Sequence, residues 1–434
     1  MSPAHDAANQ ATGATPEQAG ERRNTIPDRR ILDRDDSGRR LGDQPATRNA
    51  LPPPDDVVAP DPAASYLAII ACTLVVLWLG VIAANIALNP LIYGTSGHAR
   101  VARLFEAGHD YAVFDVNVDI RGLRRAHVAQ MTRTPEFVVI GASHWQEAHA
   151  ELVPHQLFYN AHVHRDYVED ILAGAELFLA NNRLPKTLVI SIRDLTFLPV
   201  RDRTDERWLS YVPEYERMAL RLGLAPHPWW QTLHWRRWVD LLSLRAAWEG
   251  GWQMLLAEER PGPTNAAILD ELDIVRRSGS VLWSQQHLEM FTEERALREA
   301  TQDMAFWRTQ EIAVDRHALE ALDRLLGLLR DEGVRVILAH PPFHPVYYEG
   351  VRGTRYMDGL GRVTRVTADL AAKHRLDVIG SFDPASVGCD AGMFIDSNHS
   401  NAACLKRILD QIPAPRSARA GTPAGSSHPT LAGS

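Results

Sequence analysis

The segment Glu136–His144, EFVVIGASH, decides the fold predicted for this chain of 434 residues. Its apolar, β-branched run ends at Gly141, as a buried strand of a parallel sheet does. Three later runs are also predicted as strands: Thr187–Ile192, Val334–Ala339 and Asp377–Gly380. Helical spacing of apolar residues marks the segments Val168–Asn181, Ile312–Arg330 and Ala402–Ile412. Strands that alternate with helices predict an α/β domain over about residues 135–412, with a parallel sheet covered on both faces.

The alternation of strands and helices is interrupted between about residues 203 and 310, and this stretch is predicted to be a mostly helical insert. It holds 9 of the 11 tryptophans of the chain, among them Trp229, Trp230, Trp235 and Trp238. Two interpretations of these tryptophans remain open. They form a surface that stacks on sugars or lies at a membrane interface, or they build the core of the insert itself.

Both ends of the chain are predicted to be disordered. Residues 1–65 contain no Phe, Trp or Tyr but hold 9 of the 27 prolines. Such a segment buries too little apolar surface to offset the entropy lost on ordering. Residues 413–434 are rich in Pro, Gly, Ser and Ala and are predicted to be a second disordered tail.

The uncharged stretch Tyr66–Leu88 is predicted to be a transmembrane helix. At ~1.5 Å per residue it covers roughly 34 Å, which is enough to cross the hydrocarbon core. A cleaved signal peptide is the weaker interpretation, because its apolar stretch has ~7–15 residues and begins near the N-terminus. Residues 89–134 then form a juxtamembrane connector. The flanking charges leave the orientation open, since within about 20 residues Arg48 precedes the helix and Arg100 and Arg103 follow it.

The composition excludes two classes of protein. The chain has 46 basic and 54 acidic residues, a formal net charge of −8, which excludes a generally basic nucleic-acid binder. Its three cysteines, Cys72, Cys389 and Cys404, show no CxxC spacing. That absence excludes a disulfide scaffold and a zinc ribbon.

Two short motifs carry the candidate chemistry. Ser143 follows the first predicted strand, at the sheet edge where ligands bind and where backbone N–H groups can stabilise an oxyanion. Asp396 and His399 form a D-x-x-H motif just before the last predicted helix. This spacing can place both side chains on one side of a turn, so that Asp396 orients His399 and His399 takes the serine proton. The alternative is structural, with a capped turn at the serine and ordinary surface residues at the D-x-x-H motif.

This order of motifs resembles the SGNH (GDSL-like) hydrolase superfamily. The resemblance covers about residues 135–412, apart from the tryptophan-rich insert. It implies a three-layer α/β/α fold with a parallel, flavodoxin-like sheet. It also implies that Ser143 is the nucleophile, His399 the general base and Asp396 the carboxylate that orients the base.

The same resemblance indicates where donors to an oxyanion lie. In the second motif block of the family, Asn160 matches a recurring asparagine, while His164 takes the place of the expected glycine. In the third block, Arg193 or Asp194 takes the place of the expected asparagine. An arginine offers strong donors to an anion, so both a complete and an incomplete oxyanion hole remain open.

The loop after the third predicted strand brings His340 and His344 to the same edge of the sheet. Prolines keep this loop extended, so His344 is a candidate substrate contact, with a purely structural role as the alternative. A metal site would take its ligands from His340, His344, Asp396 and His399. No spacing links these four residues, so neither a metal nor another cofactor is predicted.

A single membrane helix followed by an SGNH domain is most similar to the proteins of alginate O-acetylation and teichoic-acid D-alanylation. That similarity implies a protein of the bacterial cytoplasmic membrane, with residues 1–65 cytoplasmic and residues 89–434 outside. There Cys389 and Cys404 would meet oxidising conditions and could pair. The implied partners are an acylated glycan or envelope polymer, the lipid bilayer and other membrane acyl-transfer proteins, with no nucleic acid.

Functions of different classes follow from these motifs. The first is a membrane-anchored serine esterase or O-acyltransferase that acts on an acylated envelope glycan or polymer. The alternative is a non-catalytic SGNH-like module that binds or assembles a polymer, which the missing glycine and asparagine favour. A weaker third hypothesis is a scaffold whose N-terminal tail recruits a cytoplasmic partner.

Overall fold

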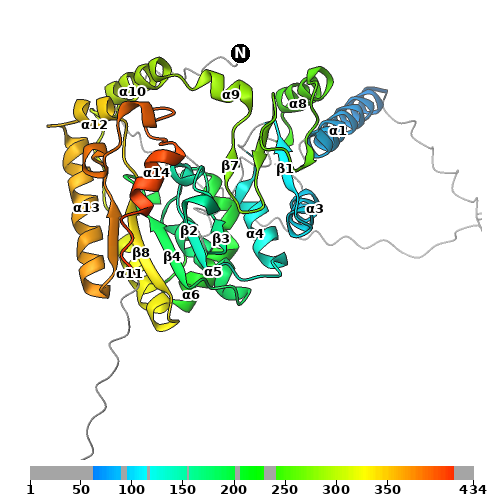
Figure 1. Ribbon diagram of the computed structural model, residues 1–434. Helices are drawn as coiled ribbons and strands as arrows, with labels where there is room; N and C mark the ends of the chain where they lie inside the picture. The colour runs from blue at the N-terminus through cyan, green and yellow to red at the C-terminus, as the bar shows by residue number, and fades with distance from the viewer. Residues whose placement is uncertain are drawn as a thin grey trace, which may run out of the picture. The chain divides into compact units, whose positions relative to one another are not determined.

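The computed structural model describes residues 62–88, 95–114, 118–153, 156–200, 206–228 and 241–414 (Figure 1). From Ala63 onward these residues belong to one unit. The predicted disordered tails, 1–65 and 413–434, therefore lie almost entirely outside the described residues. Trp229, Trp230, Trp235 and Trp238 of the predicted insert also lie outside them.

Five strands form a parallel sheet. They are β2 (Phe137–Ile140), β3 (Phe158–Asn160), β4 (Thr187–Ser191), β8 (Arg335–His340) and β9 (Asp377–Gly380). Their order is β3-β2-β4-β8-β9, and all neighbouring pairs are parallel. Four strands match the predicted runs to within one residue at each end. β3 has no counterpart among the predictions, because a strand of three residues is too short to show an apolar run.

Side chains of the sheet alternate between two separate cores, as the twofold period of a strand requires. In β2, Val138 and Ile140 enter the larger core, while Phe137 and Val139 enter the smaller one. The larger core contains residues of α5 (Val168–Ala180), α6 (Val212–Arg221), α11 (Arg316–Asp331) and α13 (Arg355–His374). The smaller core contains residues of α14 (Ala402–Leu409). Helices therefore pack on both faces of the sheet (Figure 1).

A second, antiparallel sheet joins two segments that are distant in the sequence. Its strands, in spatial order, are β5 (Gly262–Thr264), β1 (Asp110–Val113), β6 (Asp273–Val275) and β7 (Val281–Leu282). β1 comes from the predicted connector, which also forms α3 (Thr95–Glu106) and α4 (Ile120–Gln130). Phe105 and Leu123 of these helices enter the larger core. Residues 95–130 are therefore part of the folded unit and more than a linker.

In its described residues, the insert combines three of these strands with four α-helices. Besides α6, its helices are α8 (Leu244–Leu256), α9 (Gln285–Met290) and α10 (Glu293–Trp307). Its described tryptophans fall into two groups. Trp208, Trp283 and Trp307 belong to buried clusters or pack against them, whereas Trp248 and Trp252 on α8 are 68% and 50% exposed. The insert's own core accounts for the first group only.

The helix α1 (Pro62–Leu88) contains the predicted transmembrane segment. Among the described residues it is the one helix long and apolar enough to cross a membrane, and its apolar window has no buried residues. Apolar side chains that cover the whole circumference of a helix suit lipid better than a protein core. The helix accordingly points to a single-pass membrane protein.

An ion pair holds α4 and α5 together inside the domain. Arg121 Nε lies 2.7 Å from Asp170 Oδ1, and the two side chains are 2% and 1% exposed. Asp170 also accepts a hydrogen bond of 3.0 Å from the backbone N–H of Tyr167, at the start of α5. A buried carboxylate with these partners is costly to remove, because its loss takes away the hydrogen-bonded counter-charge of a buried guanidinium.

Asp170→Ala is therefore expected to lower the free energy of unfolding by about 3–5 kcal/mol. Urea unfolding of the full chain in detergent micelles measures the change. Glu294→Ala, which removes an exposed ion pair with Arg298, serves as the control and should leave the unfolding curve unchanged. Equal effects of the two substitutions would contradict the role given to the buried pair.

Candidate active site

The candidate site lies at the carboxyl end of β2. The chain leaves β2 for β3 on one side and later returns to β4 on the other side. At such a reversal of strand order, the crevice outside the carboxyl ends is where open α/β sheets bind ligands. Ser143 begins a short 3-10 turn, Ser143–Trp145, only three residues after β2 ends. The sheet topology thus brings the predicted nucleophile to the place where a ligand can reach it.

The three residues of the predicted triad form one chain of hydrogen bonds. Ser143 Oγ lies 2.8 Å from His399 Nε2, and His399 Nδ1 lies 2.6 Å from Asp396 Oδ2. The other carboxylate oxygen of Asp396 accepts hydrogen bonds from the backbone N–H groups of Asn398 and His399, at 2.8 and 2.7 Å. Both side chains of the D-x-x-H motif remain about a quarter exposed, at 25% and 24%. The arrangement has the distances that nucleophile activation requires.

The charges of Asp396 and His399 stabilise each other. Burial opposes the ionisation of Asp396, but His399 and the two backbone N–H groups outweigh it and hold the carboxyl pKa at about 2. Burial also acts to lower the pKa of His399, yet the Asp396 carboxylate outweighs it, so this pKa lies above its ordinary value of 6.5. The imidazole is thereby poised to take a proton from Ser143.

The turn that carries Ser143 is held by a glycine before the serine and a buried tryptophan after it. A Cβ atom on Gly141 would lie 2.3 Å from Cβ of Ser191, so only glycine lets the ends of β2 and β4 meet here. Trp145, two residues after the serine, is fully buried in the smaller core. The Ser143 hydroxyl is thus carried by a backbone whose position is fixed before and after it.

Glu147 ties this turn to two other parts of the chain. Its side chain accepts hydrogen bonds from Trp283 Nε1 at 2.7 Å and from the backbone N–H of Ala402 at 2.9 Å. Burial raises the pKa of this carboxyl. These partners lie 136 and 255 residues away in the sequence, so no local pattern reveals the role of Glu147. The residue positions Ser143 relative to the helix that follows the D-x-x-H motif.

Asn160, a predicted oxyanion or substrate residue, braces the same turn. Its amide nitrogen donates to the carbonyl groups of Trp145 and Ala148, at 2.6 and 3.0 Å. Its amide oxygen accepts from the N–H of His162 at 3.1 Å. Both amide hydrogens are therefore already donated, and Asn160 has none left for a substrate oxygen.

His164, the second predicted candidate, lies in the loop after β3 and is buried. Its carbonyl accepts a hydrogen bond of 2.9 Å from Arg121. The backbone conformation that favours glycine falls on the next residue, Arg165, with φ 49°. His164 itself therefore has no need to be a glycine, and the position in this loop that favours glycine is Arg165.

Arg193, the third candidate, is buried beside the site and belongs to a polar chain. Its Nε lies 3.1 Å from Asp194 Oδ1, and Tyr356 donates to the other oxygen of Asp194 at 2.7 Å. Burial disfavours the charge of Arg193, but the carboxylates of Asp194 and Asp166 outweigh it and raise its pKa. The guanidinium also acts to lower the pKa of His399. A positive charge near His399 favours an anion at the site, although Asp194 already pairs with this guanidinium.

His340 and His344 hold loops in place. His340 Nδ1 bonds the carbonyl of Ile192 at 2.8 Å, and burial lowers its pKa to about 4. His344 Nδ1 accepts from the N–H of Val346 at 3.2 Å and caps α12 (Pro345–Gly350). The backbone N–H of His344 also donates to the carbonyl of Ser397 at 2.9 Å. Within the described ranges, no group of three His, Cys, Asp or Glu side chains could hold a metal.

The D-x-x-H loop has two further anchors. Ser397 donates a hydrogen bond to Asp303 of α10, a helix of the insert. A disulfide joins Cys389 to Cys404 and closes a segment that contains both Asp396 and His399. This cross-link limits the conformations of that segment when the chain unfolds.

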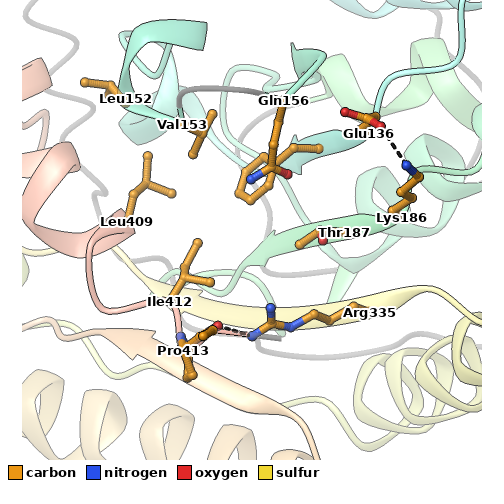
Figure 2. Close-up of a pocket in the computed structure, with 12 residues that line it drawn as sticks. Glu136, Leu152, Val153, Gln156, Lys186, Thr187, Arg335, Leu409, Ile412 and Pro413 are labelled. Atoms are coloured by element: carbon orange, nitrogen blue, oxygen red, sulfur yellow. Dashed lines mark hydrogen bonds and ion pairs between the residues drawn. The ribbon is translucent and has the colours of Figure 1, made fainter. Parts of the chain in front are cut away.

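A cavity of about 630 Å³ lies at the opposite edge of the parallel sheet from Ser143, as Figure 2 shows. Its apolar wall includes Leu152, Leu409 and Ile412. Glu136, Thr187 and Arg335 also line it, and they stand at the amino ends of β2, β4 and β8. Ser143 lies beyond the carboxyl end of β2, so this cavity is not part of the candidate site.

A scan of the sequence against protein-family models finds no match, and a search against curated proteins finds none either. The candidate site therefore rests on its own geometry.

The pKa of His399 can be measured directly by ¹⁵N-histidine NMR of the full chain in micelles. The native ring is expected to titrate above pH 6.5, because the Asp396 carboxylate stabilises its charged form. Asp396→Asn removes that charge, so the pKa of His399 should fall. His144, whose pKa burial holds well below 6.5, provides an internal reference that stays neutral. A pKa of His399 unchanged by Asp396→Asn would contradict the coupling.

Proposed function

We propose that this protein is a membrane-anchored serine esterase or O-acyltransferase of the SGNH type that acts on an acylated cell-envelope glycan or polymer. The observation that carries the proposal is the hydrogen-bond chain from Ser143 through His399 to Asp396. In this mechanism Ser143 Oγ attacks the acyl carbonyl carbon while its proton passes to His399 Nε2. The proton then goes to the leaving alcohol, and an acyl ester of Ser143 remains.

The second half of the reaction returns the acyl group. His399 takes a proton from water or from a sugar hydroxyl, whose oxygen attacks the acyl ester, and Ser143 regains the proton as the acyl group departs. Asp396 stays ionised throughout, since its pKa of about 2 lies far below neutral pH. Hydrolysis and transfer differ only in which hydroxyl enters the site.

The sheet supports assignment to the SGNH fold. Numbered by their appearance in the parallel sheet, the five strands lie in the order 2-1-3-4-5. This is the order of flavodoxin-like folds. Helices on both faces of the sheet agree with the three layers that the family resemblance implies.

The membrane helix and the disulfide together favour a location outside the cytoplasm. α1 anchors the chain, and the Cys389–Cys404 bond lies in the α/β domain. Disulfides persist in oxidising compartments and are rare in the cytosol. Under this proposal, residues 89–434 lie on the outer side of the cytoplasmic membrane of a bacterial cell, within reach of envelope polymers and other membrane acyl-transfer proteins.

The second candidate function is a non-catalytic module of the same fold that binds or assembles a polymer. The specific observation in its favour is that Asn160 has no hydrogen left for an oxyanion. In the enzyme, Arg193 and backbone N–H groups at Ser143 must supply the missing donors. Labelling by a fluorophosphonate separates the two functions, because only an activated serine reacts.

Ser143→Ala is expected to abolish both fluorophosphonate labelling and hydrolysis of p-nitrophenyl acetate while leaving thermal unfolding unchanged. Asp396→Asn should reduce kcat by about 10⁴-fold, as loss of the orienting carboxylate does in a serine triad. Ser386→Ala, at an exposed serine outside the site, is the matched control and should retain full labelling. Labelling that persists in Ser143→Ala would refute the proposed nucleophile.

The proposed orientation has its own test. Alkaline phosphatase fused after Ser434 should be active in bacterial cells, because it needs an oxidising compartment to form its disulfides. Peptide mapping without reductant should recover a cross-linked pair containing Cys389 and Cys404. An inactive fusion, with both cysteines recovered as free thiols, would place the domain in the cytoplasm.

A further inference from the structure

An exposed apolar face runs along α8. Leu244, Trp248, Trp252, Leu255 and Leu256 fall within about 120° of arc at about 100° per residue. Each of these side chains is at least half exposed, from 50% for Trp252 to 73% for Leu255. The two indole rings stack at a centroid distance of 5.6 Å. The exposed Arg245, in the first turn of α8, also falls within this arc. A long arginine side chain can extend its charged end toward lipid headgroups while its stem lies along apolar surface. The helix thus presents a mainly apolar face that the described part of the chain does not cover.

The same helix is attached to the end of the membrane helix. Asn85 of α1 is completely buried, and its amide nitrogen donates to the carbonyls of Leu241 and Ser243, at 2.8 and 3.1 Å. These two residues directly precede α8. Farther along, a Cβ atom on Gly251 would lie 3.6 Å from Cδ1 of Leu88. The segment just before α8 and the middle of α8 therefore both lie against the last turns of α1.

The length of α1 sets the depth of this contact. Its 27 residues span about 40 Å, whereas the hydrocarbon core is about 30 Å thick. At least one end of the helix must therefore extend into the headgroup region. Asn85, a polar residue that is hydrogen-bonded outside the helix, suits that region better than the hydrocarbon. The elements that pack on it lie at the same level.

We infer that α8 is an interfacial membrane helix, whose apolar face enters the boundary between lipid headgroups and acyl chains beside α1. Tryptophan favours this boundary, and amphipathic helices bury their apolar face there by about 5–10 Å. A second copy of the chain is the competing occupant. The contact with α1 favours lipid. Gly251 lies at the edge of the apolar face and next to Leu88 of α1, so the lipid that surrounds α1 also reaches the edge of this face.

This contact also connects the bilayer to the candidate active site. α8 leads into β5, which pairs with β1 in the antiparallel sheet. In β7 of that sheet, the backbone N–H of Val281 donates to the carbonyl of Gln146. Trp283, the residue after β7, donates from its indole to Glu147. Gln146 and Glu147 both lie in the turn after Ser143. An embedded α8 thus limits how far Ser143 can move from the bilayer. The membrane contact of α8 is independent of whether Ser143 is catalytic.

The test uses a fluorescent label whose emission reports lipid contact. Trp252→Cys in a Cys72→Ala background carries a single NBD label, and the full chain is reconstituted in nanodiscs that hold one copy each. The NBD emission should shift to the blue relative to the emission of the free NBD label in aqueous buffer. Lipids with a nitroxide near the headgroup end of the acyl chain should quench it strongly.

A matched label at Arg298→Cys, on a polar and exposed position of α10, should emit as in water and resist quenching. Equal quenching of the two labels would overturn the inference. A label at position 252 that is water-exposed in single-copy nanodiscs, but shielded when several copies share a bilayer, would assign the face to a second copy instead. The circular dichroism of each variant should match that of the parent chain, which excludes misfolding as the cause.

Discussion

The hydrogen bond between Ser143 and His399 is the interaction on which the proposed function depends. It joins groups 256 residues apart in the sequence, and a parallel sheet makes this possible because all its strands end at the same edge. The bond is supported from several directions. Asp396 fixes the imidazole, the Cys389–Cys404 bond closes the loop around it, and Glu147 links the serine turn to α14.

Much of this could be predicted from local patterns. Four of the five parallel strands follow apolar runs, and the serine turn and D-x-x-H motif sit at the predicted ends of the sheet. The exact partners of Asn160 and Glu147 could not be predicted, because each depends on backbone groups that only the folded chain brings near. β1 and β5–β7 also escaped prediction, because they have two to four residues each and lie outside the strand–helix alternation that revealed the equally short β2 and β9.

The insert, which lies outside the resemblance to SGNH hydrolases, contacts both halves of the candidate site. Asp303 contacts the D-x-x-H loop, and Trp283 contacts the turn after Ser143. Two strands of the insert, β5 and β6, pair with β1 in the segment between the membrane helix and the α/β domain. The same elements that complete the site therefore also connect it to the membrane anchor. For the proposed reaction on an envelope polymer, these contacts would hold the site at a fixed position relative to the bilayer.

Trapping the acyl-enzyme tests the proposed chemistry most directly. The full chain in micelles is mixed briefly with p-nitrophenyl acetate, quenched with acid and analysed by peptide mass spectrometry. If His399 activates Ser143, the peptide that contains Ser143 gains one acetyl group, and the same peptide from His399→Ala remains unmodified. An acetyl group found only on other residues, or equally on Ser143 with and without the imidazole, would contradict a serine activated by His399.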